Sequence, residues 1–184
     1  MTTLVLMLHG VGGNGAGMGG LARHLAAPGL VFRAPDAPHP FNAGFRWFDI
    51  AGITPQNRPA RVEAARKGLD ALIDLHQAET GARRVILLGF SQGAIMSIDA
   101  LARGRVAEAV IFAGRYAVAG APQPLPGARG LLVGGSFDHV IPAAEVAEAS
   151  ELLARIGVAT TYLEEPIGHE IGPSGLAAAK TFLQ

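Results

Sequence analysis

Residues 85–93 read Val85-Ile86-Leu87-Leu88-Gly89-Phe90-Ser91-Gln92-Gly93. A short apolar run precedes a Gly-x-Ser-x-Gly motif, and a stretch of helix-forming residues follows it as far as Arg103. This order predicts a buried strand that turns sharply into a helix and holds the serine in a strained backbone conformation. The flanking glycines fit such a turn, because a Cβ at either position would collide with the neighbouring strand or helix. The motif therefore predicts a nucleophile elbow that presents the Ser91 hydroxyl at the carboxyl edge of a sheet.

A serine that begins a helix also has a second interpretation. Serine is a favoured N-cap, whose hydroxyl accepts a hydrogen bond from a backbone N–H group of the first helical turn. A catalytic serine needs instead a base within hydrogen-bond reach and an acid that orients the base. The choice between the two interpretations therefore depends on the rest of the sequence.

Short runs rich in Val, Ile and Leu recur along the chain and alternate with longer helical stretches. We predict strands at residues 4–8, 30–33, 84–88, 109–112, 130–133 and 159–163, and helices at residues 19–27, 59–77, 91–103, 142–156 and 174–183. Apolar runs without polar alternation are typical of parallel strands that are buried on both faces. The pattern predicts an α/β fold, a three-layer sandwich with a mostly parallel sheet of about six strands. We expect residues 1–184 to form a single domain, with loops at residues 34–59 and 114–130.

Candidate partners for Ser91 follow two later strands. Asp138 lies beyond the strand at residues 130–133, and His169 lies beyond the strand at residues 159–163. Both positions belong to the carboxyl edge of the predicted sheet. Ser, Asp, His is also the chain order of triads built on a nucleophile elbow. We therefore predict the catalytic triad Ser91, Asp138 and His169, which favours the nucleophile interpretation of Ser91 over the N-cap.

Other acids and histidines compete for these roles. Glu164 and Glu165 are too close in sequence to His169 to approach the far side of its ring easily. His139 precedes the last strand and would break the expected order, whereas His39, in a proline-rich loop, stays open as a pocket residue. Asp138 and His169 are the better candidates.

Four motifs occur in a fixed order along the chain. They are H-G-x-G-[GD] at His9–Gly13, G-F-S-Q-G at Gly89–Gly93, G-x-x-D-x-x-[IV]-P at Gly135–Pro142 and G-H-x-I at Gly168–Ile171. With these motifs the sequence resembles the phospholipase/carboxylesterase family of α/β-hydrolases, which includes carboxylesterases and acyl-protein thioesterases. The resemblance runs over nearly the whole chain. It implies a serine hydrolase that cleaves carboxylic esters or thioesters through an acyl-enzyme intermediate.

The resemblance also implies roles for residues around Ser91. The backbone N–H groups of Val11 and Gln92 would form the oxyanion hole. Trp47 and Phe48 would line the acyl pocket, with packing within the loop as an equally good interpretation. Arg115 stands where the family usually has small residues. If it points inward, it would shorten the acyl channel or favour a negatively charged substrate.

The chain departs from the family pattern in its length. It begins almost at the first strand, whereas the family usually has an extra N-terminal segment, so we expect a minimal sheet without the N-terminal edge strands. The two long loops are dense in proline and glycine and show no apolar helical stripe. We therefore expect no lid over the site and a preference for short acyl chains.

The glycine-rich loop supports a rival function. Gly10, Gly12 and Gly15 fit the G-x-G-x-x-G fingerprint of a dinucleotide-binding oxidoreductase, and Asp36 follows at a suitable distance for a ribose contact. However, Asp36 is enclosed by prolines, and this function would leave the elbow unexplained. A further alternative is a catalytically inactive hydrolase fold that acts as a binding module, because a fold does not guarantee activity.

The composition excludes several classes of protein. The 184 residues include 15 basic and 15 acidic side chains and no cysteine. A net charge of zero gives no field that attracts nucleic acid or an anionic membrane. The lack of cysteine excludes disulfides and thiolate metal sites, and the N-terminus lacks the features of a signal peptide. We expect a cytoplasmic protein without stable membrane association or nucleic-acid binding, which needs no cofactor or metal and acts on a small-molecule ester or thioester.

Overall fold

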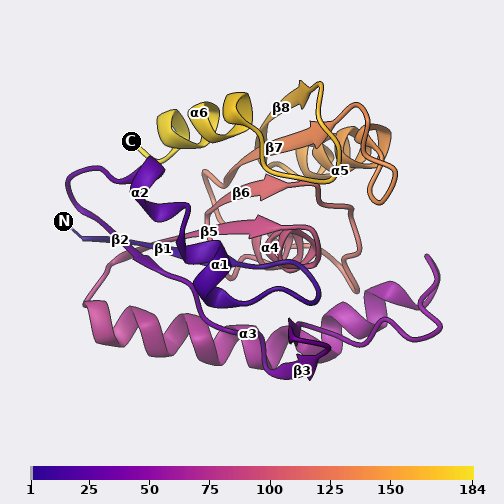
Figure 1. The fold of residues 1–184 in the computed structure, drawn as a ribbon, viewed down its shortest axis with the longest axis horizontal. Coiled ribbons are helices and arrows are strands. Elements are labelled where there is room, and N and C mark those ends of the chain that lie inside the picture. Colours follow the sequence, from indigo (N-terminus) through magenta and orange to yellow (C-terminus); the bar gives the residue numbers. More distant parts are fainter. Residues whose placement is uncertain (1) are drawn as a thin grey trace.

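The computed structural model describes residues 2–184 and contains a six-stranded sheet in the order β2-β1-β5-β6-β7-β8 (Figure 1). All neighbouring strands in this sheet are parallel. Its strands are β1 (Thr3–Leu8), β2 (Leu30–Arg33), β5 (Arg84–Phe90), β6 (Glu108–Phe112), β7 (Arg129–Gly135) and β8 (Ala159–Glu165). The helices are α1 (Gly15–Gly19), α2 (Ala22–Leu25), α3 (Arg58–Thr80), α4 (Gln92–Ala102), α5 (Ala143–Arg155) and α6 (Pro173–Phe182). The predicted α/β fold with a parallel six-stranded sheet is confirmed.

Helices cover both faces of the sheet. α3, α4 and α5 pack on one face, and α1, α2 and α6 pack on the other (Figure 1). In β1 the side chains of Leu4, Leu6 and Leu8 belong to the hydrophobic core on the side of α3, α4 and α5. Those of Val5 and Met7 belong to the core on the side of α1, α2 and α6. Successive side chains of a strand point to opposite faces, so a strand buried on both faces must be apolar throughout. This is why the apolar runs predicted the strands.

The segment after the first strand differs from its prediction. Instead of one helix at residues 19–27, two short helices form, α1 and α2, with a turn at residues 20–21 between them. Four glycines lie within residues 15–20, and each disfavours a longer helix by about 1 kcal/mol relative to alanine. The other predicted strands and helices agree with the structure to within three residues at each end. None of the helices within residues 2–184 is both long and apolar enough to cross a bilayer.

A hairpin, β3 (His39–Phe41) and β4 (Gly44–Arg46), lies where the sequence predicted a loop. Asn42, in its turn, has a φ of 53°, a left-handed conformation that asparagine adopts more readily than most residues. The hairpin also pairs with the glycine-rich loop after β1. Gly12 N–H donates to the Phe45 carbonyl and Phe45 N–H donates to the Gly13 carbonyl, both at 2.8 Å. The hairpin therefore holds this loop at the carboxyl edge of the sheet.

Candidate active site

Ser91 lies in the sharp turn between β5 and α4. Its φ is 52° and its ψ is −114°, a strained conformation for a residue that carries a side chain. A Cβ on Gly89 would overlap the Gly93 carbonyl, and a Cβ on Gly93 would overlap the Leu8 carbonyl. The Ser91 hydroxyl makes no capping hydrogen bond to α4. The turn thus has the geometry of the predicted elbow, and Ser91 stands at the N-cap position of α4 without capping the helix through its side chain.

The Ser91 hydroxyl forms a hydrogen bond with His169 instead. Its Oγ lies 2.9 Å from Nε2 of the imidazole. On the other side of the ring, Nδ1 lies 2.7 Å from Oδ2 of Asp138. The three side chains come from the segments that follow β5, β7 and β8, all at the carboxyl edge of the sheet. The structure therefore brings together the three residues predicted as a triad.

Asp138 is buried, with 4% of its surface exposed. Its Oδ1 accepts hydrogen bonds from the N–H groups of Val140 (2.8 Å) and Ile141 (2.9 Å). Burial raises the pKa of Asp138, but the bonds from His169 and these two N–H groups outweigh it and hold the pKa below its usual value. An ionised carboxylate can only accept, so Nδ1 of His169 carries the proton. Its Nε2 then holds the lone pair that faces the Ser91 hydroxyl.

Arg115 is bound to the loop that carries Asp138. Its guanidinium donates to the Val140 carbonyl at 2.7 Å and pairs with Glu145, in the first turn of α5, at 3.2 Å. Because Val140 N–H binds Asp138, the arginine supports this loop from the opposite side of the same residue. Its role in a substrate pocket stays a prediction.

The two competing acids have other partners. Glu165 is buried, and its carboxylate accepts the N–H groups of Ser174 (2.8 Å) and Gly175 (3.0 Å) at the start of α6. Glu164 accepts the hydroxyl of Tyr162 at 3.1 Å. Burial and this bond raise the pKa of Tyr162 to about 12. The capping of α6 by Glu165 was not predictable from the sequence, because nine residues separate Glu165 from Ser174.

The loop after β1 lies against the elbow. A Cβ on Gly10 would come within 3.2 Å of the Ser91 Cβ and of the Phe90 ring. Neither the Val11 N–H nor the Gln92 N–H donates a hydrogen bond to another group within residues 2–184. Free N–H groups beside a nucleophile can bind the negative oxygen of a tetrahedral intermediate.

His9 anchors the start of this loop. Its buried imidazole accepts the N–H of Ala37 at Nε2 (3.0 Å). Its Nδ1 must therefore carry a proton in the neutral ring, and it donates to the Gly10 carbonyl at 2.7 Å. Sequence reasoning assigned no role to His9 beyond its place in the first motif, because Ala37 lies 28 residues away.

The side chain of Gln92 ties the elbow to the segment after β4. Its Oε1 accepts the N–H of Trp47 at 2.7 Å, and its Nε2 donates to the Phe48 carbonyl at 2.9 Å. Trp47 is 1% exposed and Phe48 is 5% exposed, as packing within the loop would require. Both border a cavity that they share with His39 and Arg61. Their role in binding an acyl group stays a prediction.

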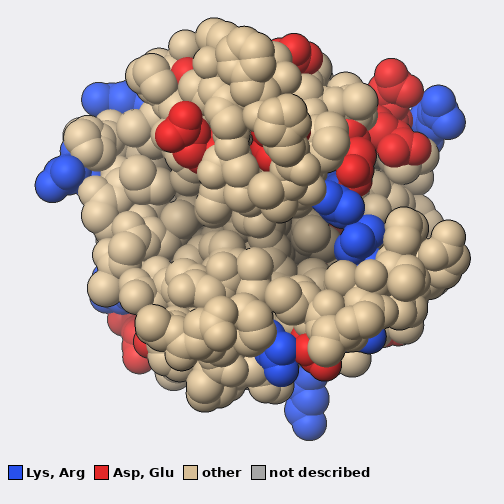
Figure 2. Space-filling model, turned by 45° about the vertical axis from the view of Figure 1, so that its right-hand side comes forward, with Lys and Arg blue, Asp and Glu red and all other residues tan. Residues whose placement is uncertain are grey.

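A different cavity, of about 520 Å³, lies beside His169. It lies between the loop after β1 and the segment before α6, and its apolar lining includes Met18, Leu21, Phe90 and Ile171. Figure 2 brings the carboxyl ends of the strands towards the viewer and shows a hollow in the middle of this face. The visible floor of the hollow consists of residues other than Lys, Arg, Asp and Glu. The volume of the cavity beside His169 suits a small organic molecule.

The sequence model of the phospholipase/carboxylesterase family matches residues 1–184. This chain belongs to that family. It is 35% identical over 178 residues to Esterase YpfH from Escherichia coli (strain K12), which covers 91% of this chain and 76% of the relative. Acyl-protein thioesterase 1 homolog 1 from Dictyostelium discoideum is 29% identical over 107 residues, 51% of this chain and 47% of the relative. The crystal structure of esterase PE8 has a TM-score of 0.86 and 30% identity, and the match covers 99% of this chain and 91% of that one.

As a member of the phospholipase/carboxylesterase family, the chain is a hydrolase of the esterase and thioesterase type. This membership contradicts the oxidoreductase alternative. The structure also gives the suspected ribose contact another role, because Asp36 Oδ1 accepts the N–H of Gly15 at 2.7 Å. Within residues 2–184, no group of three or more His, Asp or Glu side chains is arranged to hold a metal ion.

Proposed function

We propose that Ser91 is the nucleophile of an esterase or thioesterase, with His169 as its general base and Asp138 as the acid that orients the base. The hydrogen-bonded series from Ser91 through His169 to Asp138, at a strained elbow, is the observation that carries the proposal. An adjacent base activates a serine hydroxyl, which is a weak nucleophile by itself. The lowered pKa of Asp138 supports its role, because an anion stabilises the imidazolium that forms.

In the first half of the reaction, Ser91 Oγ bonds to the substrate carbonyl carbon while its proton passes to His169 Nε2. The electron pair of the carbonyl π bond moves to oxygen, and the N–H groups of Val11 and Gln92 bind this oxyanion. When the carbonyl re-forms, the bond to the leaving oxygen or sulfur breaks, and His169 returns its proton to that atom. A water molecule then attacks the acyl-serine by the same steps and releases a carboxylic acid and free Ser91.

The substrates in this proposal are small carboxylic esters and thioesters. The relatives of this chain include an esterase and an acyl-protein thioesterase, which supports both classes. Both classes pass through the same tetrahedral intermediate and need the same groups. The preference for short acyl chains and the cytoplasmic location belong to the proposal as predictions from the sequence.

Replacement of the nucleophile tests the proposal. Ser91→Ala should reduce the turnover of p-nitrophenyl butanoate by at least about 10³-fold, because no covalent intermediate can form. The melting temperature should change little. Ser136→Ala is a matched control, because Ser136 is exposed at the same edge of the sheet, and it should keep the parent activity. Turnover by Ser91→Ala within tenfold of the parent would show that another group is the nucleophile. A parent protein that hydrolyses no ester or thioester would favour the inactive binding module.

A further inference from the structure

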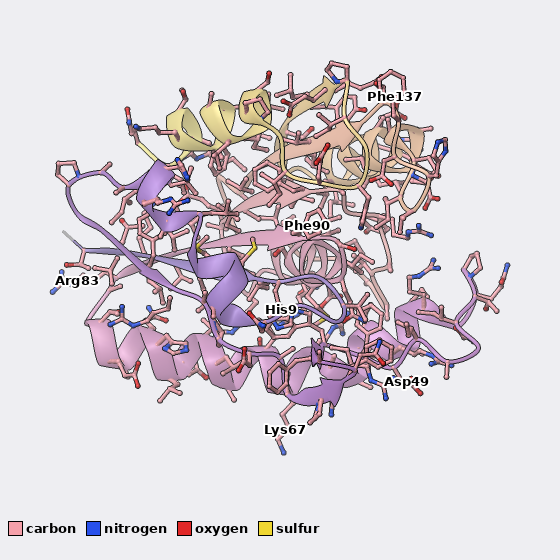
Figure 3. The ribbon with its side chains drawn as sticks, in the orientation of Figure 1. His9, Asp49, Lys67, Arg83, Phe90 and Phe137 are labelled. Carbon is pink, nitrogen blue, oxygen red and sulfur yellow. The ribbon has the colours of Figure 1, made fainter. Side chains whose placement is uncertain are left out.

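The reaction described above assigns no part of the substrate to the cavity beside His169. We call it the His169 cavity and define it by Met18, Leu21, Phe90, His169, Glu170 and Ile171. Met18 lies in α1 and Leu21 follows it, whereas Phe90 ends β5. His9 and Phe90, both labelled in Figure 3, line this cavity together with residues of α1. The cavity is thus bounded by the proposed oxyanion loop on one side and by the proposed base on the other.

His169 decides which part of the substrate faces this cavity. When the tetrahedral intermediate collapses, Nε2 protonates the leaving oxygen or sulfur, so that atom must lie within roughly 2.6–3.2 Å of Nε2. The cavity borders the same imidazole, against which the Phe90 ring packs with a centroid distance of 5.0 Å. A group attached to the leaving atom therefore has the cavity directly before it. The acyl chain leaves the tetrahedral carbon in another direction.

The side chains of the lining indicate the chemistry of that group. Met18, Leu21, Phe90 and Ile171 offer an apolar surface. The described lining contains no Lys or Arg, and its one acidic side chain is Glu170. A phosphate or carboxylate on the leaving group would find no cation and would face this like charge. The Oδ1 of Asn14 accepts the N–H of Gly17 at 2.8 Å, and its amide carries no charge that would balance an anion.

We propose that the His169 cavity is a subsite for the leaving group and that it takes an uncharged, apolar alcohol or thiol. Met18 and Leu21 set its size. This inference rests on the proposed function, because it uses His169 as the acid that protonates the leaving atom. It distinguishes among substrates that the triad treats alike, because it disfavours leaving groups that carry phosphate.

Two series of esters test this assignment. The first keeps a butanoyl group and varies the alcohol from methanol to hexanol, with 6-hydroxyhexanoate as the charged counterpart of hexanol, and acid release is titrated. The second keeps p-nitrophenol and varies the acyl group from acetyl to octanoyl. Leu21→Trp partly fills the cavity, and Leu75→Trp is the control on the exposed surface of α3, where Leu75 is 51% exposed.

For the parent, kcat/KM should rise from methyl to hexyl butanoate and should fall at least about tenfold when hexanol is replaced by 6-hydroxyhexanoate. In Leu21→Trp the ratio of hexyl to methyl should fall at least about tenfold. In the same variant, the kcat/KM ratios within the acyl series should stay within about twofold of those of the parent, because all members of that series share one leaving group. Leu75→Trp should change neither series.

A change in the acyl ratios with constant alcohol ratios would overturn the assignment and make this cavity the acyl pocket. An active Leu21→Trp variant with both series unchanged would remove the cavity from substrate binding altogether. Failure of the proposed function looks different, because the parent itself would then hydrolyse no member of either series.

Discussion

Gln92 follows Ser91 in the elbow, and its side chain binds both the N–H of Trp47 and the carbonyl of Phe48. Its backbone N–H is one of the two proposed oxyanion donors. The elbow was readable from the sequence because its glycines, serine and flanking strand are neighbours in the chain. The amide contacts were not, because these partners lie 45 and 44 residues away. The same holds for the capping of α6 by Glu165.

Gln92→Glu tests the contribution of these side-chain contacts. The substitution keeps the backbone N–H but places a carboxylate oxygen, which cannot donate, against the buried Phe48 carbonyl. We expect a loss of roughly 1–3 kcal/mol in the free energy of unfolding, measured by urea denaturation, and a lower kcat because the elbow shifts. Gln56→Glu, at an exposed position, should leave both quantities unchanged. Parent-like stability of Gln92→Glu would show that the amide contacts contribute little.

Asp138→Asn tests the proposed orienting acid. An asparagine can present its amide N–H to Nδ1 and stabilise the wrong tautomer of His169, so kcat should fall by about 10⁴-fold with little change in KM. The measurement is steady-state hydrolysis of p-nitrophenyl butanoate. A mild effect here, with a severe one in Glu164→Gln or Glu165→Gln, would reassign the acid.

The pH dependence of the parent follows from the lowered pKa of Asp138. This carboxylate stays ionised in more acidic solution than an ordinary aspartate does, so its own protonation should not be the first cause of lost activity on acidification. A protonated imidazole cannot accept the serine proton, and the rate should therefore rise with pH.

The strands of the sheet were predictable as elements because burial on both faces requires an uninterrupted apolar run. The hairpin was not, because three-residue strands are too short to show a period. The sheet is further joined at its opposite, amino edge. There Glu108, at the start of β6, pairs with Arg84 of β5 and with Arg129 of β7, the latter at 2.7 Å. This cluster lies far along the strands from the proposed site.

Glu108→Gln should therefore lower stability without affecting catalysis. Burial raises the pKa of Glu108, but its bonds with Arg84 and Arg129 outweigh it and lower the pKa. A carboxylate with a lowered pKa stabilises the fold above its unfolded pKa, and this contribution is lost as acidification protonates it. Because the arginines are partly exposed, we expect a loss of only roughly 1–2 kcal/mol at neutral pH. This loss should shrink in acid as Glu108 of the parent becomes protonated. Thermal melts across pH measure it.

Glu148→Gln, at an exposed position of α5, is the control for these melts and should behave like the parent at every pH. A constant difference between the parent and Glu108→Gln from neutral to acidic pH would contradict the ionic contribution. A loss of kcat comparable to that of Asp138→Asn would contradict the separation of the two edges.

The fold places the segments that carry Ser91, Asp138 and His169 at the carboxyl edge of the sheet, although they are far apart in the sequence. This placement was predictable because the strands are parallel. Every strand of a parallel sheet ends at the same edge, so residues that follow β5, β7 and β8 must meet there. The shape of the His169 cavity was not predictable, because it depends on where α1 lies relative to the segment before α6. The segment at residues 34–57 has only the hairpin as regular structure, and residues 114–128 have no helix or strand.

A lid that uncovers the site at a lipid surface needs an amphipathic helix, and neither of these two segments contains one. We therefore expect p-nitrophenyl esters from acetyl to hexanoyl to be cleaved with a higher kcat/KM than palmitoyl. Rates should show no jump at the micellar threshold of the substrate. The measurement is an acyl-chain series taken across that threshold. A maximum at long chains with a sharp rise above the threshold would indicate a lysophospholipase.

The most direct test of the proposed mechanism is covalent capture of the nucleophile. A fluorophosphonate reacts with an activated serine and leaves a stable phosphonyl ester, which peptide mass spectrometry locates. We predict a single adduct on the peptide that contains Ser91, no adduct in Ser91→Ala, and much slower labelling in Asp138→Asn, because activation needs the oriented base. Labelling at another residue, or no labelling of a folded and ester-hydrolysing parent, would contradict the assignment of Ser91 as the nucleophile.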